Sequence, residues 1–293
     1  MNWTPIVAHI AEITGRPFSP IASKPIAGGC INSAAVLSEG RRRYFVKFNH
    51  ASRLGAFEAE VDGLKELRRS QTVRVPSPIC CGAAGDRSYF VLEYVDLHAT
   101  SSKALVALGQ QLAEMHRTTS EQFGWWRDNT IGATVQRNTP TADWAEFWQV
   151  HRLGFQLELA AGNGYHGRLL DLGEKLLADL GILFQDYQPQ PSLLHGDLWC
   201  GNYAEDAAGR PVIFDPAPYF GDREADLAMT ELFGGFGPAF YEAYQNTWPL
   251  DAGYQMRRHL YNLYHVLNHL NLFGSGYLAQ CETLIDRILQ TAA

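Results

Sequence analysis

Two carboxylates and an amide in the second half of the chain stand at spacings that suit phosphoryl transfer. Asp197 lies five residues before Asn202, and Asp215 ends a short apolar run thirteen residues after that amide. In phosphoryl transfer, one carboxylate accepts the proton of the attacking hydroxyl, while an amide and a second carboxylate hold magnesium against the phosphates of ATP. The spacing therefore predicts Asp197 as the catalytic base and Asn202 and Asp215 as Mg²⁺ ligands.

The same spacing is typical of the protein-kinase catalytic loop. That loop reads His-x-Asp with an Asn five residues after the Asp, and an Asp-Phe-Gly metal site follows it. Here the first element is complete from His195 to Asn202, whereas the second is altered to Asp215-Pro216. We expect His195 to brace the loop rather than to take part in the chemistry.

A glycine turn and a lysine in a strand indicate where ATP would bind. The turn lets backbone N–H groups approach a phosphate, although such a turn also fits a plain hairpin. Lys47 stands in an apolar strand, where kinases place the amine that contacts the α- and β-phosphates. Glu60 is its preferred partner, with Glu58 as the rival, because apolar residues place Glu60 nearer the buried helix face. The turn consists of Gly28, Gly29, Cys30, Ile31 and Asn32.

The segment after Asp215 indicates a small acceptor. Asp226 follows Asp215 by only eleven positions, which leaves no room for the long segment on which protein kinases seat a polypeptide. We expect Asp226 to hold the catalytic loop through hydrogen bonds. The neighbouring Asp222, Arg223 and Glu224 either face the acceptor or form a solvated helix N-terminus favoured by the helix dipole.

The periodicity predicts an α+β, bilobal, kinase-like fold. Short β-rich runs occupy residues 21–27, 34–37, 44–48 and 89–94, and a helix at 56–69 interrupts them. Helical periodicity then dominates at 102–116, with Ser101 as its N-cap, and at 141–161, 167–187, 222–234 and a long C-terminal series. Short strands at 193–194, 202–205 and 212–215 bracket the catalytic motif. We expect an ATP-binding N-lobe at 1–95 and a helical C-lobe at 96–293 that carries the catalytic loop, the metal site and the acceptor pocket. Backbone groups of Glu93, Tyr94 and Val95, at the join, would recognise adenine.

Composition excludes several classes of partner. The 293 residues are 46% apolar and 19% charged, which is ordinary for a globular protein. A net charge of -7 argues against a dedicated nucleic-acid binder. No apolar stretch approaches the roughly 18 residues of a membrane span, and the first residues predict no secretory signal. Five cysteines show no metal-binding pattern. We therefore expect a cytoplasmic protein without nucleic-acid or membrane partners.

The chain resembles the fructosamine kinase (ketosamine-3-kinase) family, which belongs with aminoglycoside and choline phosphotransferases of protein-kinase-like fold. The resemblance is strongest over residues 194–236. There the run Gly-Asp-Arg-Glu-Ala-Asp-Leu at 221–227 is specific, whereas His-Gly-Asp at 195–197 is shared by the wider group. Further matches lie at 28–32, 45–47, 57–67, 136–138 and 264–274, and the similarity runs from about residue 15 to 290.

The resemblance implies ATP-dependent phosphorylation of the 3-hydroxyl of a ketosamine, an adduct of a sugar and an amine. Ribulosamine, erythrulosamine and fructosamine adducts, small or protein-bound, are all open as acceptors. Spontaneous loss of the 3-phosphate would then free the amine, which is deglycation. ATP and Mg²⁺ are the implied cofactors: Asp197 is the base, Asn202 and Asp215 bind metal, and Lys47, paired with Glu60, contacts the ATP phosphates. An aminoglycoside or other small-alcohol phosphotransferase is the alternative, and a non-catalytic nucleotide-binding scaffold is a more distant one.

Candidates for the acceptor pocket are aromatic and imidazole side chains. Trp199, two residues after Asp197, would form the floor under a sugar, although packing explains it equally well. His265 and His269 share a helix face with Asn262 through spacings of three and seven residues, and they either line the pocket or are satisfied core groups. Cys30 lies beside the expected phosphates, so its oxidation would block ATP or crosslink two chains. A monomer and a redox-dependent homodimer are therefore both open.

Overall fold

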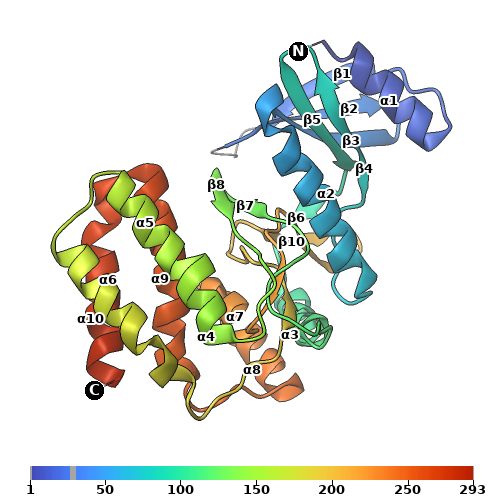
Figure 1. Cartoon of the computed structure of the whole chain (residues 1–293). Helices are drawn as coiled ribbons and strands as arrows, with labels where there is room; N and C mark the ends of the chain where they lie inside the picture. The colour runs from blue at the N-terminus through green and yellow to red at the C-terminus, as the bar shows by residue number, and fades with distance from the viewer. Residues whose placement is uncertain (1, 27–30, 293) are drawn as a thin grey trace.

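The computed structural model describes residues 2–26 and 31–292, with a β-rich part followed by a mainly helical part (Figure 1). Gly28, Gly29 and Cys30 of the predicted glycine turn lie outside the described residues. The first part is a five-stranded antiparallel sheet in the order β1-β2-β3-β5-β4. Its elements are α1 (Thr4–Thr14), β1 (Ala22–Ile26), β2 (Ser33–Glu39), β3 (Arg42–His50), a 3₁₀ turn (Ala51–Arg53), α2 (Leu54–Arg69), β4 (Pro78–Ala84) and β5 (Arg87–Glu93).

Alternation along β5 explains how two helices cover this sheet. Successive side chains of a strand point to opposite faces, so Phe90 lies beside Phe57 of α2, whereas Val91 belongs to the buried cluster that contains Ile10 of α1. Lys47 of β3 stands opposite Phe90 in the strand register, so its side chain also points towards α2. Because side chains alternate between the two faces of the sheet, the Lys47 amine, expected to bind ATP, points towards α2, the helix that carries Glu60.

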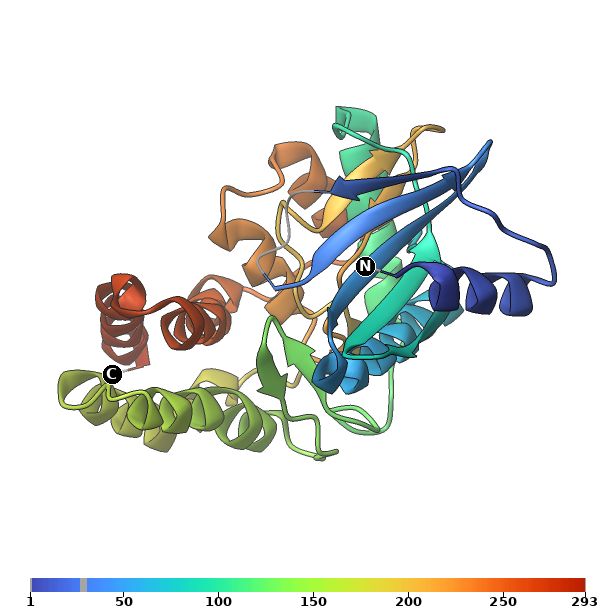
Figure 2. The ribbon, with the colours of Figure 1, turned by 90° about the horizontal axis from the view of Figure 1, so that it is seen from above.

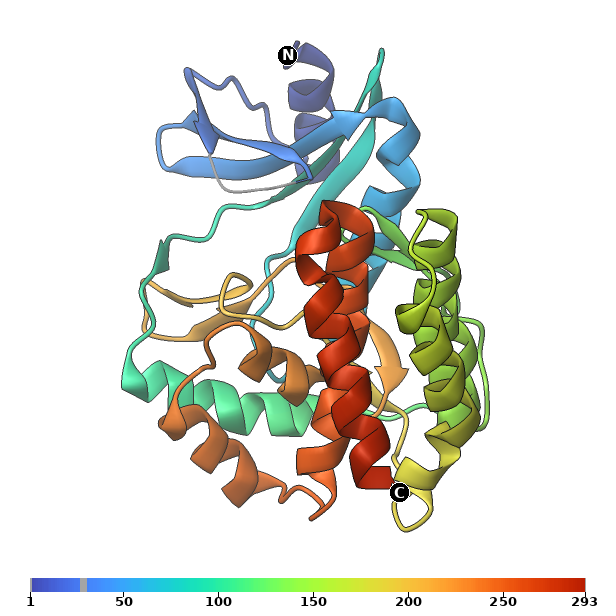
Figure 3. The same ribbon diagram turned by 90° about the vertical axis from the view of Figure 1, so that its left-hand side faces the viewer.

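The helical part lies below the sheet in the view of Figure 3. Helices α9 and α10 pack beside α5 and α6, at the end of the molecule away from α1 (Figure 2). Its helices are α3 (Ser102–His116), α4 (Trp144–Trp148), a π-helical turn (Gln149–Gly154), α5 (Phe155–Gly162), α6 (Arg168–Asp179), a 3₁₀ helix (Leu180–Phe184), α7 (Glu224–Leu232), α8 (Pro238–Thr247), α9 (Tyr254–Phe273), a 3₁₀ turn (Ser275–Tyr277) and α10 (Leu278–Ala292).

Short strands in the second part bracket the catalytic motif. β9 (Ser192–Leu194) pairs with β12 (Tyr219–Gly221), and β10 (Tyr203–Asp206) lies between β11 (Pro211–Ile213) and β6 (Leu97–His98). β7 (Asn129–Ile131) and β8 (Thr134–Gln136) form a separate hairpin beside α2. These strands fix both ends of the loop from residue 195 to 202 and both ends of the segment from 214 to 218.

Most predicted elements are present with shifted ends. The helix at 102–116 is confirmed, and its cap Ser101 accepts a hydrogen bond from the Ala104 N–H at 3.2 Å. The helix expected from residue 141 begins at Trp144 and contains a π-helical turn, and the one expected from 222 begins at Glu224. The sequence does not predict α1, β4, β6, β12 or the β7–β8 hairpin. The expected division near residue 95 falls between β5 and β6 and stays a prediction. No helix among the described residues is long and apolar enough to cross a membrane.

Candidate functional site

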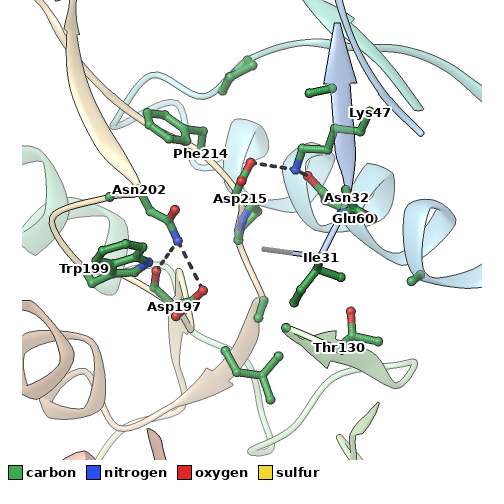
Figure 4. A pocket seen from close by; sticks show the side chains of 18 of the residues that line it. Ile31, Asn32, Lys47, Glu60, Thr130, Asp197, Trp199, Asn202, Phe214 and Asp215 are labelled. Atoms are coloured by element: carbon green, nitrogen blue, oxygen red, sulfur yellow. Dashed lines mark hydrogen bonds and ion pairs between the residues drawn. The ribbon is translucent and has the colours of Figure 1, made fainter. Parts of the chain in front are cut away.

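A cavity of about 790 Å³ collects the chemistry-bearing residues from both parts of the chain. Its walls come from β2, β3 and α2 above, from the segment 92–97, from the β7–β8 hairpin, and from the loops after β9 and β11 (Figure 4). α9 closes the remaining side with four polar or aromatic positions. The predicted site residues that line it are Ile31, Asn32, Lys47, Glu60, Glu93, Tyr94, Val95, Asp197, Trp199, Asn202, Asp215, His265 and His269.

Lys47 is held between two carboxylates at the sheet end of the cavity. Its Nζ lies 2.6 Å from Glu60 Oε1 and 2.7 Å from Asp215 Oδ1. Burial alone would lower the pKa of Lys47, but the charges of Asp215 and Glu60 raise it above its ordinary value. The amine is therefore a fixed cation. Glu60, not the exposed Glu58, is its partner on α2.

Asp197 and Asn202 face each other at the opposite end. The Asn202 amide nitrogen donates to the Asp197 carbonyl oxygen at 2.8 Å and to its Oδ2 at 3.3 Å (Figure 4). Burial and the nearby charge of Asp215 raise the pKa of Asp197 to about 7, against the lowering effect of the Asn202 hydrogen bond. A carboxylate with a pKa near neutrality can both accept and release a proton at physiological pH.

The loop that carries Asp197 is fixed from below by Asp226 of α7. The Asp226 carboxylate accepts hydrogen bonds from the N–H groups of His195 at 2.7 Å and Gly196 at 2.8 Å, as the sequence predicts. His116 of α3 contacts it at 3.2 Å. The His195 ring in turn bonds to the Phe214 carbonyl at 3.0 Å. His195 therefore joins the catalytic loop to the segment that carries Asp215.

Asp215 has a backbone conformation that non-glycine residues rarely adopt. Its φ is +58°, in the left-handed region that costs an L-residue energy. Among the described residues, Lys47 is its one side-chain partner, through Oδ1, which leaves Oδ2 for a ligand. The Asn202 amide likewise directs its nitrogen to Asp197, so its oxygen remains as an acceptor. A carboxylate and an amide oxygen are hard donors of the kind Mg²⁺ prefers, with phosphate oxygens completing its shell.

Residues 93–95, at the end of β5, contact two arginine side chains. Arg74 reaches Glu93 Oε1 at 3.4 Å and pairs with the buried carboxylate of Asp206 in the helical part. The Arg43 guanidinium lies 4.1 Å from the centre of the Tyr94 ring. Asn32 accepts a hydrogen bond from Asn49 of β3 at 2.8 Å. The two arginine contacts tie Glu93 and Tyr94 to the sheet part and, through Asp206, to the helical part.

One side of the cavity, formed by α9 together with Trp199 and Phe233 from neighbouring segments and here called the α9 wall, is aromatic and uncharged at neutral pH. His265 is 6% exposed, and burial, with a smaller contribution from His269, lowers its pKa to about 3. The His269 ring packs 5.1 Å from that of Phe233. Asn262, predicted on the same face, does not line the cavity. The α9 wall comprises Trp199, Phe233, His265, Asn268, His269, Leu272 and Phe273.

Asp222, Arg223 and Glu224 neither line the cavity nor face solvent, so both expectations for them are wrong. All three are buried. Glu224 forms a two-bonded pair with Arg257 of α9 at 2.8 and 3.0 Å. Asp222 accepts hydrogen bonds from the hydroxyls of Tyr187 and Tyr261, and Arg223 donates to the Trp248 and Pro249 carbonyls. Their partners lie far along the chain, which is why the local sequence resembles a solvated helix start.

Comparison with known proteins places this geometry in a family. The family model described as fructosamine kinase matches residues 2–291. A probable ketoamine kinase of Synechocystis is 46% identical over 292 residues, covering 98% of this chain and 97% of the relative. A chloroplastic protein-ribulosamine 3-kinase of Arabidopsis thaliana is 43% identical over 268 residues, covering 90% and 82%.

Solved structures agree on the fold. A crystal structure from Haemophilus somnus that carries the name fructosamine-3-kinase superposes with a TM-score of 0.90 at 27% identity, covering 98% of this chain and 97% of that one. An aminoglycoside phosphotransferase mutant in ternary complex with AMP-PNP and hygromycin B superposes with a TM-score of 0.67 at 16% identity, covering 98% and 99%, which bears on the fold alone. The chain has the α+β, bilobal, protein-kinase-like fold, and with a family model matched from residue 2 to 291 it belongs to the fructosamine kinase family.

Proposed function

We propose that the chain transfers the γ-phosphoryl group of ATP to the 3-hydroxyl of a ketosamine. The single observation that carries this is the convergence of Lys47, Asp197, Asn202 and Asp215 on one cavity whose α9 wall is uncharged. These four side chains supply the cation, the base and the metal ligands that phosphoryl transfer requires. Family membership and the names of the relatives, ketoamine kinase and protein-ribulosamine 3-kinase, support a ketosamine as the acceptor.

The residues divide the reaction between them. Lys47, fixed by Glu60, contacts the ATP phosphates, and Asn202 and Asp215 hold Mg²⁺, which neutralises charge on the phosphates when bound. Asp197 accepts the proton of the acceptor hydroxyl. The hydroxyl oxygen bonds to the γ-phosphorus as the bond between the γ-phosphorus and the β,γ-bridging oxygen breaks. ADP carries away the electron pair of that bond. After transfer, elimination of inorganic phosphate from sugar carbon 3 leaves an imine at carbon 1, and hydrolysis of that imine by water frees the amine.

The α9 wall suits a sugar better than a polycation. Trp199 offers an apolar face, and the neutral imidazoles of His265 and His269 each offer one donor and one acceptor nitrogen. The carboxylates that line the cavity in the described part of the chain are Glu60, Glu93, Asp197 and Asp215, and none of them belongs to the α9 wall. An aminoglycoside carries several ammonium groups and would need carboxylates on the acceptor side.

An acceptor panel tests this assignment. Coupled detection of ADP compares turnover of four kinds of acceptor: ribulose-lysine, erythrulose-lysine, fructose-lysine and a set of aminoglycosides. We expect turnover with the ketosamines and none above background with the aminoglycosides. Asp197→Ala should abolish turnover while leaving nucleotide binding intact, which separates an enzyme from a nucleotide-binding scaffold. Turnover with aminoglycosides alone, or unchanged turnover in Asp197→Ala, would refute the proposal.

We also propose that the protein works in a reducing cytoplasm on small or protein-bound glycated amines. The four cysteines in the described residues, Cys80, Cys81, Cys200 and Cys281, are free thiols, as is usual in reducing compartments. Cell fractionation tests the location, and recovery in an oxidising compartment would contradict it.

A further inference from the structure

Arg152 is a buried cation without a carboxylate partner among the described residues. Its side chain is 0% exposed. Nη2 donates to Asn138 Oδ1 at 2.8 Å, Nη1 donates to the carbonyls of Arg137 and His151, and Nε has no partner. Removing a charge from water costs several kcal/mol unless it is paired. An arginine left in this state therefore calls for a role that outweighs the cost.

Three aromatic rings take the place of a counter-ion. The Arg152 guanidinium carbon lies 4.1 Å from the ring centre of Tyr219, 4.6 Å from that of Phe147 and 5.6 Å from that of Tyr264. The negative faces of aromatic rings attract a desolvated cation. Tyr219 belongs to β12, directly after the segment that carries Asp215, so Arg152 contacts this segment through the Tyr219 ring.

The backbone around Arg152 is built to turn it inward. Arg152 lies in the π-helical turn Gln149–Gly154, between α4 and α5. Such a turn inserts an extra residue into a helix, is rare, and occurs often at functional sites. Gly154 is required there, since a Cβ at this position would stand 2.5 Å from the Gln149 carbonyl oxygen. The local structure thus departs from a regular helix where Arg152 enters the core.

A chain of hydrogen bonds runs from Arg152 to the metal-site segment. Asn138 Nδ2 donates to Asn129 Oδ1 at 3.1 Å, and Asn129 Nδ2 donates to the Pro218 carbonyl at 2.8 Å. Gln136 Nε2 donates to the Ala217 carbonyl at 2.9 Å, and its Oε1 accepts from the Tyr264 hydroxyl of α9. The chain ends two and three residues after Asp215.

We propose that Arg152 is a positioning residue for Asp215: through Asn138 and the Tyr219 ring it fixes residues 216–219 and so holds Asp215 in the left-handed conformation that presents its carboxylate to the cavity. This kinase lacks the long segment that follows the metal-binding Asp in protein kinases, and the Arg152 network anchors the short segment instead. The inference rests on the proposed metal-binding role of Asp215 and is independent of which acceptor is used.

The test measures how much Mg²⁺ strengthens nucleotide binding. Isothermal titration with AMP-PNP, with and without Mg²⁺, gives a ratio of affinities for the wild type and for Arg152→Met, Tyr264→Phe, Arg137→Met and Asp215→Ala. Residues that orient metal ligands typically contribute about 10- to 100-fold to metal affinity. We expect the ratio to fall about tenfold or more in Arg152→Met, in line with that range, and by less in Tyr264→Phe. Arg137 is exposed and stacks on Phe155, so Arg137→Met should keep the wild-type ratio.

A merely structural Arg152 would lower the melting temperature and leave the ratio unchanged, which would overturn the proposal. If Arg152→Met does not fold, Tyr264→Phe provides the test, because it removes a single hydroxyl from the network. A wild-type affinity ratio in Tyr264→Phe would also overturn the proposal. Asp215→Ala tests the metal-binding role of Asp215 separately from the positioning role of Arg152. If Mg²⁺ strengthens AMP-PNP binding as much in Asp215→Ala as in the wild type, Asp215 does not bind the metal. If the Mg²⁺ effect is lost in Asp215→Ala but kept in Arg152→Met, the metal-binding role stands and only the positioning role of Arg152 is overturned.

Discussion

At the scale of single residues, burial sets the chemistry of Asp197. Its folded-state pKa of about 7 lies above the value of about 3.9 for an exposed Asp. The folded protein therefore binds more protons than the unfolded chain between these two values, and its stability falls as pH rises through that window. Above pH 7 the ionised carboxylate destabilises the fold fully, which is the cost of keeping a base at the reaction centre.

Asp197→Asn removes that cost and the base together. In the absence of Mg²⁺ and nucleotide, we expect the variant to melt roughly 2–4 °C above the wild type at pH 8, with a smaller difference at pH 5. Turnover should fall by at least about 100-fold at any pH. Differential scanning fluorimetry at both pH values, beside Asp171→Asn on the exposed face of α6 as the control, measures the effect. Equal differences at the two pH values would show that Asp197 is not the titrating group.

At the scale of elements, the catalytic loop depends on one glycine. Gly196 has a φ of +81°, and a Cβ there would stand 2.0 Å from the Ala217 carbonyl oxygen. Because that atom belongs to the backbone of the neighbouring segment, the loop would have to move. The close approach lets the Ala217 N–H donate to the His195 carbonyl at 2.9 Å, which joins the loop to the segment after Asp215.

Gly196→Ala should therefore lose both activity and stability. Gly209, with a φ of +77° and its nearest contact a side-chain atom at 3.5 Å, is the matched control, since it pays the same left-handed strain of roughly 1–2 kcal/mol. Urea unfolding of the two alanine variants isolates the contact with Ala217. We expect Gly196→Ala to be the less stable and to lose nearly all turnover, and Gly209→Ala to retain turnover. Equal stabilities would contradict the account of the loop.

The start of α7 is held by a buried ion pair rather than by substrate. Arg257→Met leaves Glu224 buried without its partner and should cost about 3–5 kcal/mol of unfolding free energy. The adjacent Arg258 pairs with the partly exposed Glu231, so Arg258→Met should cost about 1 kcal/mol or less. Below its melting temperature, Arg257→Met should keep the wild-type KM for the acceptor. A raised acceptor KM without loss of stability would restore a substrate role for this helix start.

The sequence predicts these elements where local patterns are sufficient. Short β-rich runs predict β3 and β5, and the spacing of Asp197, Asn202 and Asp215 predicts residues that the structure brings to one cavity. The sequence does not predict β4, because its small residues, from Cys80 to Ala84, show no alternation of apolar and polar side chains. The sequence does not predict the π-helical turn either, because its apolar residues continue the spacing of an ordinary α-helix.

Long-range polar contacts are the part that local patterns cannot predict. Gln136 bonds to Tyr264, 128 residues away, and Glu224 pairs with Arg257, 33 residues away. Charged residues at a helix start look solvated until the element that buries them is known. The Arg152 network and the correction at Asp222, Arg223 and Glu224 share this cause.

At the scale of the whole molecule, the cavity joins a side made by the sheet, where we propose that ATP binds, to a side made by α9, where we propose that the acceptor binds. Lys47 from β3, Asp197 from the loop after β9 and His265 from α9 all line it, so catalysis requires both parts of the chain to be in place. Asp215 links the two sides, because it contacts Lys47 of the sheet and belongs to the segment bonded by Gln136 of the hairpin, which in turn bonds to Tyr264 of α9.

The central claim is that Asp197 takes its proton from the 3-hydroxyl of a ketosamine. Phosphorus NMR of reactions with ribulose-lysine, erythrulose-lysine and fructose-lysine, run with ATP and Mg²⁺, tests it most directly. We predict a phosphomonoester signal that couples to the proton on sugar carbon 3 and then gives way to inorganic phosphate as lysine is released, and no such signal with Asp197→Asn. A stable phosphate ester at another position, or ATP consumption with no ketosamine phosphate, would contradict it.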